Sequence, residues 1–458
     1  MSMRHAIFAF VCLLAVFRCR GVDVDNYVKR QMQRYHIPGV SLAIVKDGKV
    51  ISAKSYGLAS VELNVPATKD SIYQIGSITK VFTATAVMIL VNDGKIRLDD
   101  KITNYVSGLP RAWNGISVRH LLSHTSGITN DYVDVGDFST RLRDPLSPKQ
   151  FLESATNFPL ASTPGEKWAY SNTGYYLLGL IIEKASGKSY ADFMSQRIFV
   201  PLGMLSTSVN SLETVVTNRA GGYSWWNYGG LHNENYLDMS WAYSAGGITS
   251  SVMDLARWDA ALYTEKLLPK SRLEQMWTLE KGQYPLGWGV NISKQYGRGL
   301  AHYGGTPGFS SGIVRWIDQR LTIIILENMH MVPSWDIVDG ISYFYLPDLI
   351  KPKKDDEPEL TRRHRELLSA AVAGTLNPEL FAEESRKQFF PHEASQLQSD
   401  LMIPGSMKSF YLLDETLTEG PKPHRVRHYR AMFRKENFLL EVEFGDDGKI
   451  RDLRIAFK

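Results

Sequence analysis

The chain has 458 residues, of which 52 are Lys or Arg and 48 are Asp or Glu, so its formal net charge is +4. A hydrophobic fraction of 44% with 22% charged residues is typical of globular proteins and excludes extensive intrinsic disorder. The length favours about two or three structural units. So weak a charge, without a Lys/Arg block, gives no reason to expect a nucleic-acid partner.

The first residues are typical of a secretory signal. A short basic start precedes a 12-residue apolar run, Ala6 to Phe17, which is too short to cross a bilayer comfortably. We expect residues 1–21 to be a signal peptide that directs export to a periplasmic or extracellular location; the alternative is an uncleaved N-terminal anchor. The only two cysteines, Cys12 and Cys19, lie in this segment, so the exported chain would have no disulfide and no cysteine nucleophile.

The next region, residues 22–350, opens with a predicted hairpin, because Ser41–Val45 and Lys49–Ala53 flank the turn Asp47-Gly48. Ser77–Val91 has neither Gly nor Pro and is apolar on nearly every side, which predicts a buried helix. The predicted order is an early hairpin, then helices, then a late hairpin. This order predicts a sheet whose edges are far apart in sequence, with a helical insertion. The other predicted elements are helices near Pro148–Thr156, Gly174–Lys184 and Asp254–Tyr263, and a late hairpin of Gly312–Ile317 and Leu321–Leu326.

A long aromatic segment, Ala220–Trp241, is rich in Gly, Trp, Tyr and Asn and has no clear period. Such a loop is often a pocket wall or lid. We therefore expect this segment, which includes Trp225, Trp226 and Tyr228, to border a binding pocket.

A boundary follows at residues 351–358, whose sequence KPKKDDEP consists of charge and proline and predicts a linker. Beyond it, residues 359–458 predict a small α+β domain in which one helix precedes several strands. The helix is expected at Glu359–Ala373, and the strands at Ser409–Leu413, His424–Phe433, Phe438–Phe444 and Ile450–Phe457.

The sharpest chemical signal is Ser77-Ile78-Thr79-Lys80. Residues three apart at the start of a helix lie on one face, so the Ser77 hydroxyl and the Lys80 amine should be neighbours. A lysine near a helix N-terminus and out of water loses its charge easily, and neutral Lys80 could then take the proton of Ser77 and make it a nucleophile. The alternative is an N-cap serine with a surface lysine; the buried run that follows argues against it.

Two further motifs carry polar side chains. In Tyr170-Ser171-Asn172, a phenol beside an ammonium can shuttle a proton, and the Asn172 amide can hold Lys80 or a substrate carbonyl. In His302-Tyr303-Gly304-Gly305, the glycines would let a substrate lie against a strand edge. Taken alone, the first motif is more typical of a turn with Asn172 as a helix cap, and the second is more typical of a Gly-rich loop with an incidental histidine.

Together, the three motifs resemble those of the serine penicillin-recognising family, which includes class C β-lactamases, D-alanyl-D-alanine carboxypeptidases, D-aminopeptidases and related esterases. Their order and spacing fit, and so do flanking stretches such as RHLLSHTSGI at Arg119 and SAGGITSS at Ser244. The resemblance covers roughly Asp25 to Leu326. It implies a β-lactamase/transpeptidase-like α/β (α+β) fold, in which helices and a helical subdomain flank an antiparallel sheet.

The resemblance also implies roles at matching positions. Ser77 would be the acylated nucleophile, Lys80 its activating partner and Tyr170 the general acid/base. Asn172, His302, Gly304 and Gly305 would bind substrate, and the backbone N–H groups of Ser77 and Gly305 would form an oxyanion hole. The cationic residue common at the first position of the third motif is here His302, which points toward the D-aminopeptidase-like and esterase-like branches.

The sequence thus predicts an exported serine hydrolase that acts on peptide, amide or ester substrates through an acyl-enzyme. A β-lactamase, or a penicillin-binding sensor that does not turn over, are the alternatives. No metal or organic cofactor is implied. The expected partner is a small-molecule or peptide substrate, without nucleic acid and without a membrane beyond an N-terminal anchor, and the oligomeric state stays open.

Ser310 in G-x-S-x-G is a weak rival nucleophile, because a β run follows it instead of a helix. His120 and His124 lack a third zinc ligand.

Overall fold

The computed structural model describes residues 24–129, 142–157, 159–211, 213–226, 229–279, 284–291, 298–346, 351–390, 406–418, 423–433 and 437–457. The expected signal peptide, residues 1–21, and Tyr228 lie outside these ranges. None of the helices in these ranges combines the length and the apolarity that a membrane span requires. The chain divides into two compact units, Val28–Val338 and Asp339–Lys458 with the N-terminal residues to Tyr27, so the boundary falls inside helix α12 (Ser334–Tyr345).

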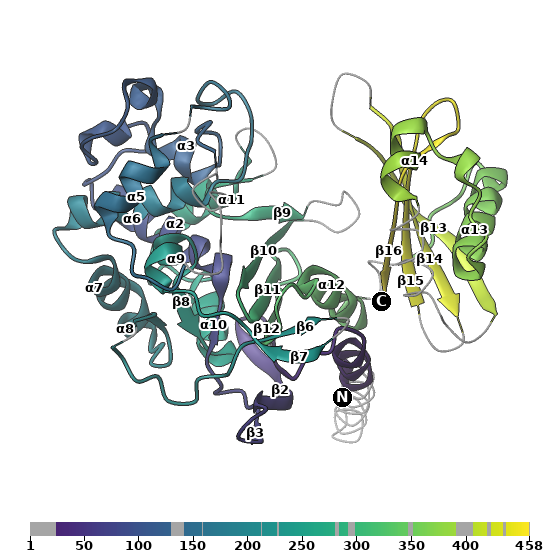
Figure 1. Ribbon diagram of the computed structural model, residues 1–458, viewed down its shortest axis with the longest axis horizontal. Helices are drawn as coiled ribbons and strands as arrows, with labels where there is room; N and C mark the ends of the chain where they lie inside the picture. Colours follow the sequence, from purple (N-terminus) through teal and green to yellow (C-terminus); the bar gives the residue numbers. More distant parts are fainter. Residues whose placement is uncertain are drawn as a thin grey trace, which may run out of the picture. The chain divides into compact units, whose positions relative to one another are not determined.

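A seven-stranded antiparallel sheet forms the centre of the unit Val28–Val338 (Figure 1). Its order, β3-β2-β1-β12-β11-β10-β9, brings the early and late hairpins together where β1 pairs with β12, and Ala43 lies opposite Ile324. Asp47 and Gly48 have φ values of 52° and 73°, as a tight hairpin turn requires. The strands are β1 Gly39–Lys46, β2 Lys49–Ser60, β3 Val65–Pro66, β9 Gly289–Asn291, β10 Gly299–Thr306, β11 Phe309–Trp316 and β12 Leu321–Glu327.

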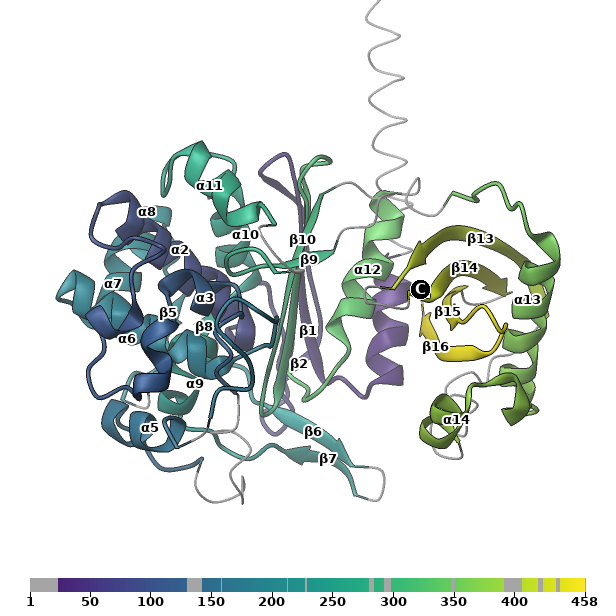
Figure 2. The same ribbon diagram turned by 90° about the horizontal axis from the view of Figure 1, so that it is seen from above.

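Most helices of this unit lie on one face of its sheet (Figure 2). Helix α10 (Val252–Ala261) contacts β1 and β12 directly, and α2 (Thr79–Asn92) packs with α6 (Asn172–Ser186). Every residue of α2 from Thr79 to Leu90 is buried, which confirms the prediction of a buried helix. The central position of α2 fixes the stretch around Ser77 at the sheet.

Shorter elements complete the unit. The further helices are α3 Val118–Leu122, α5 Pro148–Ala155, α7 Tyr190–Met194, α8 Val200–Leu202, α9 Met239–Gly246 and α11 Lys270–Trp277. The unit also contains the 3-10 helices Gly76–Ile78, Ile102–Asn104 and Arg111–Gly115, and the π-helix Ser195–Phe199. Two small sheets join β4 Tyr73–Gln74, β8 Ile248–Ser250 and β5 Ser208–Val209, and β6 Tyr223–Trp226 with β7 Gly230–Asn233.

The C-terminal unit packs α13 (Pro358–Ala373) on a four-stranded antiparallel sheet, which confirms the predicted succession of a helix and strands. Phe438, Leu440 and Val442 are fully buried and alternate with the partly exposed Leu439 and Glu441 along one strand, as one face of a half-buried strand requires. The other elements are the 3-10 helix Pro378–Leu380, α14 Glu383–Phe389, β13 Met407–Leu417, β14 Arg425–Phe433, β15 Asn437–Phe444 and β16 Ile450–Phe457.

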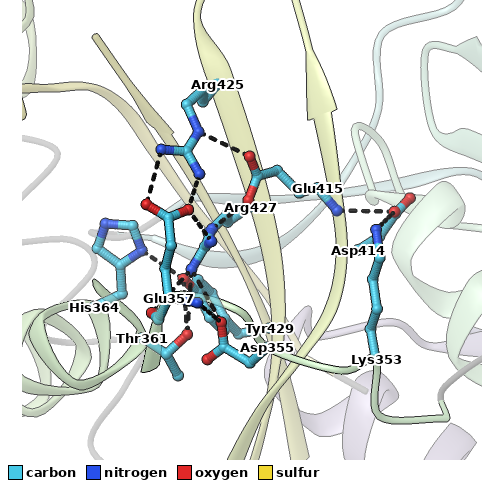
Figure 3. A network of polar contacts seen from close by, with 10 residues as sticks. All are labelled: Lys353, Asp355, Glu357, Thr361, His364, Asp414, Glu415, Arg425, Arg427 and Tyr429. Atoms are coloured by element: carbon cyan, nitrogen blue, oxygen red, sulfur yellow. Dashed lines mark hydrogen bonds and ion pairs between the residues drawn. The ribbon is translucent and has the colours of Figure 1, made fainter. Parts of the chain in front are cut away.

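A network of ion pairs ties the start of α13 to this sheet (Figure 3). The Arg427 side chain, 3% exposed, donates to Glu415 at 2.5 Å and to Glu357 at 2.6 Å, and it lies 3.5 Å from Asp355. Arg425 pairs with the same two glutamates. The segment expected to be a linker is therefore attached to the C-terminal sheet, because its acidic residues meet the arginines of β14.

We predict that Arg427→Leu destabilises the C-terminal unit by about 2–3 kcal/mol. The leucine would leave Glu357 and Glu415 facing each other without one of their cations; the partial exposure of both carboxylates keeps the cost below that of a fully buried pair. Arg454→Ala is the control, because Arg454 is 71% exposed and its ion pairs should contribute less than about 1 kcal/mol. Urea unfolding of both variants measures the difference, and equal stability would contradict a structural role for the network.

Candidate active site

Ser77 is the partly exposed residue in an otherwise buried stretch from Ser71 to Lys80. The 3-10 turn Gly76–Ile78 carries it directly into α2. Gly76 has φ +49°, and a Cβ there would lie 2.7 Å from the Gly305 nitrogen. Only glycine allows this turn to approach β10 so closely. The Ser77 hydroxyl is therefore held at a defined point beside the end of β10.

The Lys80 amine is fully buried one turn after Ser77. Its Nζ lies 3.0 Å from Ser77 Oγ and donates to Asn172 Oδ1 at 2.7 Å and to the Ala245 carbonyl at 2.8 Å. A neutral amine has two N–H groups and one lone pair. Because the two oxygens accept both N–H groups, the lone pair is left for the hydroxyl hydrogen of Ser77.

Burial lowers the pKa of Lys80 well below its ordinary value, because an ammonium out of water loses its solvation. The two acceptors, an amide oxygen and a backbone carbonyl, are uncharged and do not restore that loss as a carboxylate would. The arrangement therefore favours the neutral amine, which is the form that can remove a proton from Ser77.

Tyr170 completes the polar contacts of Ser77. Its hydroxyl donates to Ser77 Oγ at 2.8 Å, and its ring centroid lies 4.8 Å from Lys80 Nζ. Burial raises the pKa of Tyr170, so its side chain is a neutral phenol and a hydrogen-bond donor. The structure thus brings Ser77 and Lys80 together with Tyr170 and Asn172, a pair distant in sequence from the first, in an arrangement suited to proton transfer.

Gly304 and Gly305 lie at the end of β10, and with Ser77 and Asn172 they line a cavity of about 780 Å³. A Cβ on Gly304 would collide with the Ile75 carbonyl, so only glycine fits at that position. The close approach of Gly305 to the turn at Gly76 brings its backbone nitrogen near Ser77. This is where the predicted oxyanion donors, the N–H groups of Ser77 and Gly305, would act.

His302 lies behind the cavity wall. It is buried, its Nδ1 lies 2.9 Å from the Tyr303 carbonyl, and its Nε2 lies 2.8 Å from the Tyr284 hydroxyl. Burial, together with the nearby Lys80, lowers the pKa of His302 to about 3, so the ring is neutral. The residue of this pair that lines the cavity is Tyr303. The structure differs here from the expectation that His302 faces the substrate, because alternate residues of a strand point to opposite faces.

The cavity walls are mainly apolar and aromatic. Tyr236, Leu237 and Trp241 from the expected aromatic segment line it, together with Tyr303 and Trp335. Trp225 and Trp226 lie in β6 and are not among the described residues that line the cavity. The Trp225 ring stacks on the His36 ring instead, with 3.7 Å between their centroids. Within the aromatic segment Ala220–Trp241, the second half therefore forms the pocket wall that the sequence predicts.

Charge on the cavity wall is sparse. Among the described residues that line it, none is Lys or Arg, and Glu234 is the one carboxylate. The Glu234 side chain is 14% exposed; its Oε1 accepts from the Asn235 N–H at 2.8 Å, and its Oε2 lies 4.0 Å from His330 Nδ1. Sequence reasoning missed Glu234, because no motif marks it and only the tertiary fold brings it to the cavity.

The rival nucleophile Ser310 lies within β11, and no helix follows it, so the α/β-hydrolase interpretation fails. Its hydroxyl donates to the Met329 carbonyl at 2.8 Å and accepts from the Val332 N–H at 3.0 Å. Among the described residues, no group of His, Cys, Asp and Glu side chains could hold a metal ion, so His120 and His124 form no zinc site there.

Comparisons with known proteins agree with this geometry. A family model described as "Beta-lactamase" matches residues 24–330. Penicillin-binding protein 4* of Bacillus subtilis (strain 168) is 32% identical over 316 residues, which cover 65% of this chain and 69% of that protein. Further curated relatives are 28% or 29% identical, and the chain covers 63% of their length, less than two thirds.

Solved structures resemble the chain as well. The octameric penicillin-binding protein homologue from Pyrococcus abyssi has a TM-score of 0.65 and 24% identity, over 95% of this chain and 98% of that one. The D-amino acid amidase from Ochrobactrum anthropi SV3, complexed with D-phenylalanine, has a TM-score of 0.63 and 25% identity, over 71% of this chain and 99% of that one. These likenesses confirm the predicted fold class.

We predict that Lys80→Met lowers the rate of Ser77 acylation by about 10²–10⁴-fold, the usual contribution of a general base. Methionine fills the buried space without supplying a lone pair to the serine hydroxyl. The burst of nitrophenolate from a 4-nitrophenyl ester measures acylation. Lys95→Met, at an exposed position, is the control and should acylate as the unaltered chain does. Acylation at an unchanged rate in Lys80→Met would exclude Lys80 as the base.

Proposed function

The chain belongs to the beta-lactamase family, a family of serine hydrolases, and from this membership we propose that it cleaves amides or esters of apolar amino acids through an acyl-enzyme on Ser77. The observation that carries the proposal is the hydrogen-bonded series Tyr170–Ser77–Lys80, with 2.8 Å and 3.0 Å between successive polar atoms. The family membership also confirms the resemblance that the sequence motifs carried.

In the proposed mechanism, Ser77 Oγ attacks the substrate carbonyl carbon while its proton passes to Lys80 Nζ. The resulting oxyanion accepts hydrogen bonds from the N–H groups of Ser77 and Gly305. When the intermediate collapses, the bond to the leaving group breaks, and the leaving amine or alcohol takes the Tyr170 proton. Lys80 then reprotonates Tyr170. A water molecule attacks the acyl group by the same route in reverse, and a free acid leaves.

The sparse charge of the cavity supports the choice of substrate class. Penicillins and peptidoglycan stem peptides carry a carboxylate, which would enter a site without Lys or Arg among its described lining residues. Bringing an unpaired carboxylate out of water is costly. An ammonium group, in contrast, would find the Glu234 carboxylate, and an apolar side chain would find walls such as Trp241 and Trp335.

The D configuration of the proposed substrate is taken from the name of the D-amino acid amidase from Ochrobactrum anthropi, whose solved structures hold D-phenylalanine, L-phenylalanine or L-phenylalanine amide. We therefore take D-phenylalanine amide as the probe. A β-lactamase or a penicillin-binding sensor is the second candidate, supported by the similarity to penicillin-binding protein 4*.

We propose that the enzyme acts after export, on the strength of the apolar run from Ala6 to Phe17. Expression of the full chain in a secreting host tests this. The released protein should begin close to residue 22, as determined by N-terminal sequencing. A chain retained in the cytoplasm with its first residues intact would contradict export.

We predict that Ser77→Ala abolishes hydrolysis of D-phenylalanine amide, and that Glu234→Gln lowers kcat/KM for it by about 10–100-fold. The second effect corresponds to the loss of a charge-assisted hydrogen bond worth about 1.5–3 kcal/mol. Glutamine keeps the size of the side chain and an oxygen for the Asn235 N–H. The matched substrate is 3-phenylpropanamide, which lacks the amine; Glu234→Gln should change its kcat/KM by less than about threefold, since only the charged contact is lost.

Two results would overturn this choice of substrate. One is equal loss on both amides in Glu234→Gln, which would mean that Glu234 supports the cavity without meeting an amine. The other is a faster reaction of the unaltered chain with benzylpenicillin than with D-phenylalanine amide. Drug turnover would then favour a β-lactamase, and a lasting adduct on Ser77, detected by intact mass, would favour a sensor.

A further inference from the structure

His124 occupies a backbone position that ordinarily belongs to another residue type. It follows the C-cap Ser123 of α3 and has φ +57°, in the left-handed region where helices usually end on Gly or Asn. The Cβ of a histidine makes this conformation sterically costly, whereas glycine adopts it without that cost, and the His124 ring is buried as well. A histidine that occupies this position despite the cost of its positive φ is a candidate for a functional role in its tertiary contacts.

His124 contacts both sequence neighbours of Tyr170, besides packing its ring on Tyr175 and Tyr284. The Ser171 N–H donates to His124 Nδ1 at 3.1 Å, and the Ala169 N–H donates to the His124 carbonyl at 2.8 Å. The imidazole ring also packs against the Tyr170 ring, with 4.5 Å between centroids. One residue thus holds the backbone before the phenol, the backbone after it and the face of its ring.

The protonation state and tautomer of the His124 imidazole are consistent with these contacts. Because Nδ1 accepts from Ser171, a neutral ring carries its proton on Nε2. Burial, with Lys80 and His302 nearby, lowers the pKa of His124 well below its ordinary value, which keeps the ring neutral. In the part of the chain that the structure describes, Nε2 has no hydrogen-bond partner. The contact to Ser171 is therefore the polar contact that the ring makes there.

We propose that His124 is a positioning residue for Tyr170, which fixes the loop on both sides of the phenol and so holds its hydroxyl on Ser77 Oγ. Tyr170 precedes α6 on a segment without regular structure, where a shift of the backbone would move the hydroxyl away from its 2.8 Å contact. The inference rests on the proposed role of Tyr170 as the acid that protonates the leaving group.

Two substitutions separate this role from general packing. His124→Asn and His124→Leu both remove the ring, but the Asn oxygen lies close to the position of Nδ1 and can accept from the Ser171 N–H. Two substrates that share the same acyl group then show whether Tyr170 donates its proton to the leaving group. D-phenylalanine amide needs a proton on its leaving group, whereas the 4-nitrophenyl ester of D-phenylalanine releases a stable anion without one.

We expect His124→Leu to lower kcat/KM by about 30–100-fold for the amide and by less than about fivefold for the ester, within the usual range for general acids. His124→Asn should stay within about fivefold of the unaltered chain on both substrates. A structural role alone would lower both activities together, in proportion to the folded fraction. Equal losses on amide and ester, or a His124→Asn variant as impaired as His124→Leu, would overturn the proposal.

Hydrogen exchange tests the contact without a substrate. The segment from Trp168 to Asn172 should exchange at least about tenfold faster in His124→Leu than in the unaltered chain, with His124→Asn close to the latter. Unchanged exchange in His124→Leu would show that His124 does not hold this loop. If the unaltered chain cleaves neither substrate, the proposed substrate class has failed, and the exchange measurement still decides whether His124 holds the loop.

Discussion

The burial of the Lys80 amine beside Ser77, among uncharged acceptors, is the interaction on which the rest of the site depends. An ammonium at this position would be deprived of water and of any carboxylate partner at its two acceptors, so the fold favours the neutral amine. That choice opposes stability: between the lowered pKa of folded Lys80 and the ordinary pKa of lysine, the unfolded chain binds a proton that the folded chain releases. The surrounding core of α2 and α6 offsets this cost and holds a base ready at neutral pH.

Lys80 and Arg427, two buried cationic side chains, have opposite surroundings. In the C-terminal unit, Arg427 is surrounded by carboxylates, and Figure 3 shows each arginine of the network facing acidic side chains. Such a compensated cation stabilises the attachment of α13 and has no reactive lone pair. Lys80 lacks that compensation and can therefore exchange a proton with Ser77.

Much of the fold followed from patterns in the sequence. The Asp47-Gly48 turn, the buried run after Ser77 and the alternation at Phe438 to Phe444 each predict an element that the structure contains. The neighbourhood of Ser77 and Lys80 also follows from helical spacing alone, because three residues make nearly one turn. These features are local, so each can be recognised from a single short segment of the sequence.

The parts of the site that depend on tertiary contacts could not be predicted in this way. Tyr170 and Asn172 lie more than 90 positions after Ser77, and only the resemblance to a family brought them together. The orientation of His302 depends on which face of β10 meets the helices, which the motif itself does not specify. Glu234 and His124 carry no motif of their own, and their roles follow from what lies beside them in space.

The neutral amine is the central claim, and a direct titration of Lys80 tests it. The side-chain nitrogen signals of ¹⁵N-lysine-labelled protein can be followed by NMR, with Lys80 assigned from its absence in Lys80→Met. We predict that Lys80 is neutral at pH 7 and gains its proton only as the pH falls through a strongly lowered pKa. A Lys80 side chain that is still protonated at pH 7 would contradict this claim.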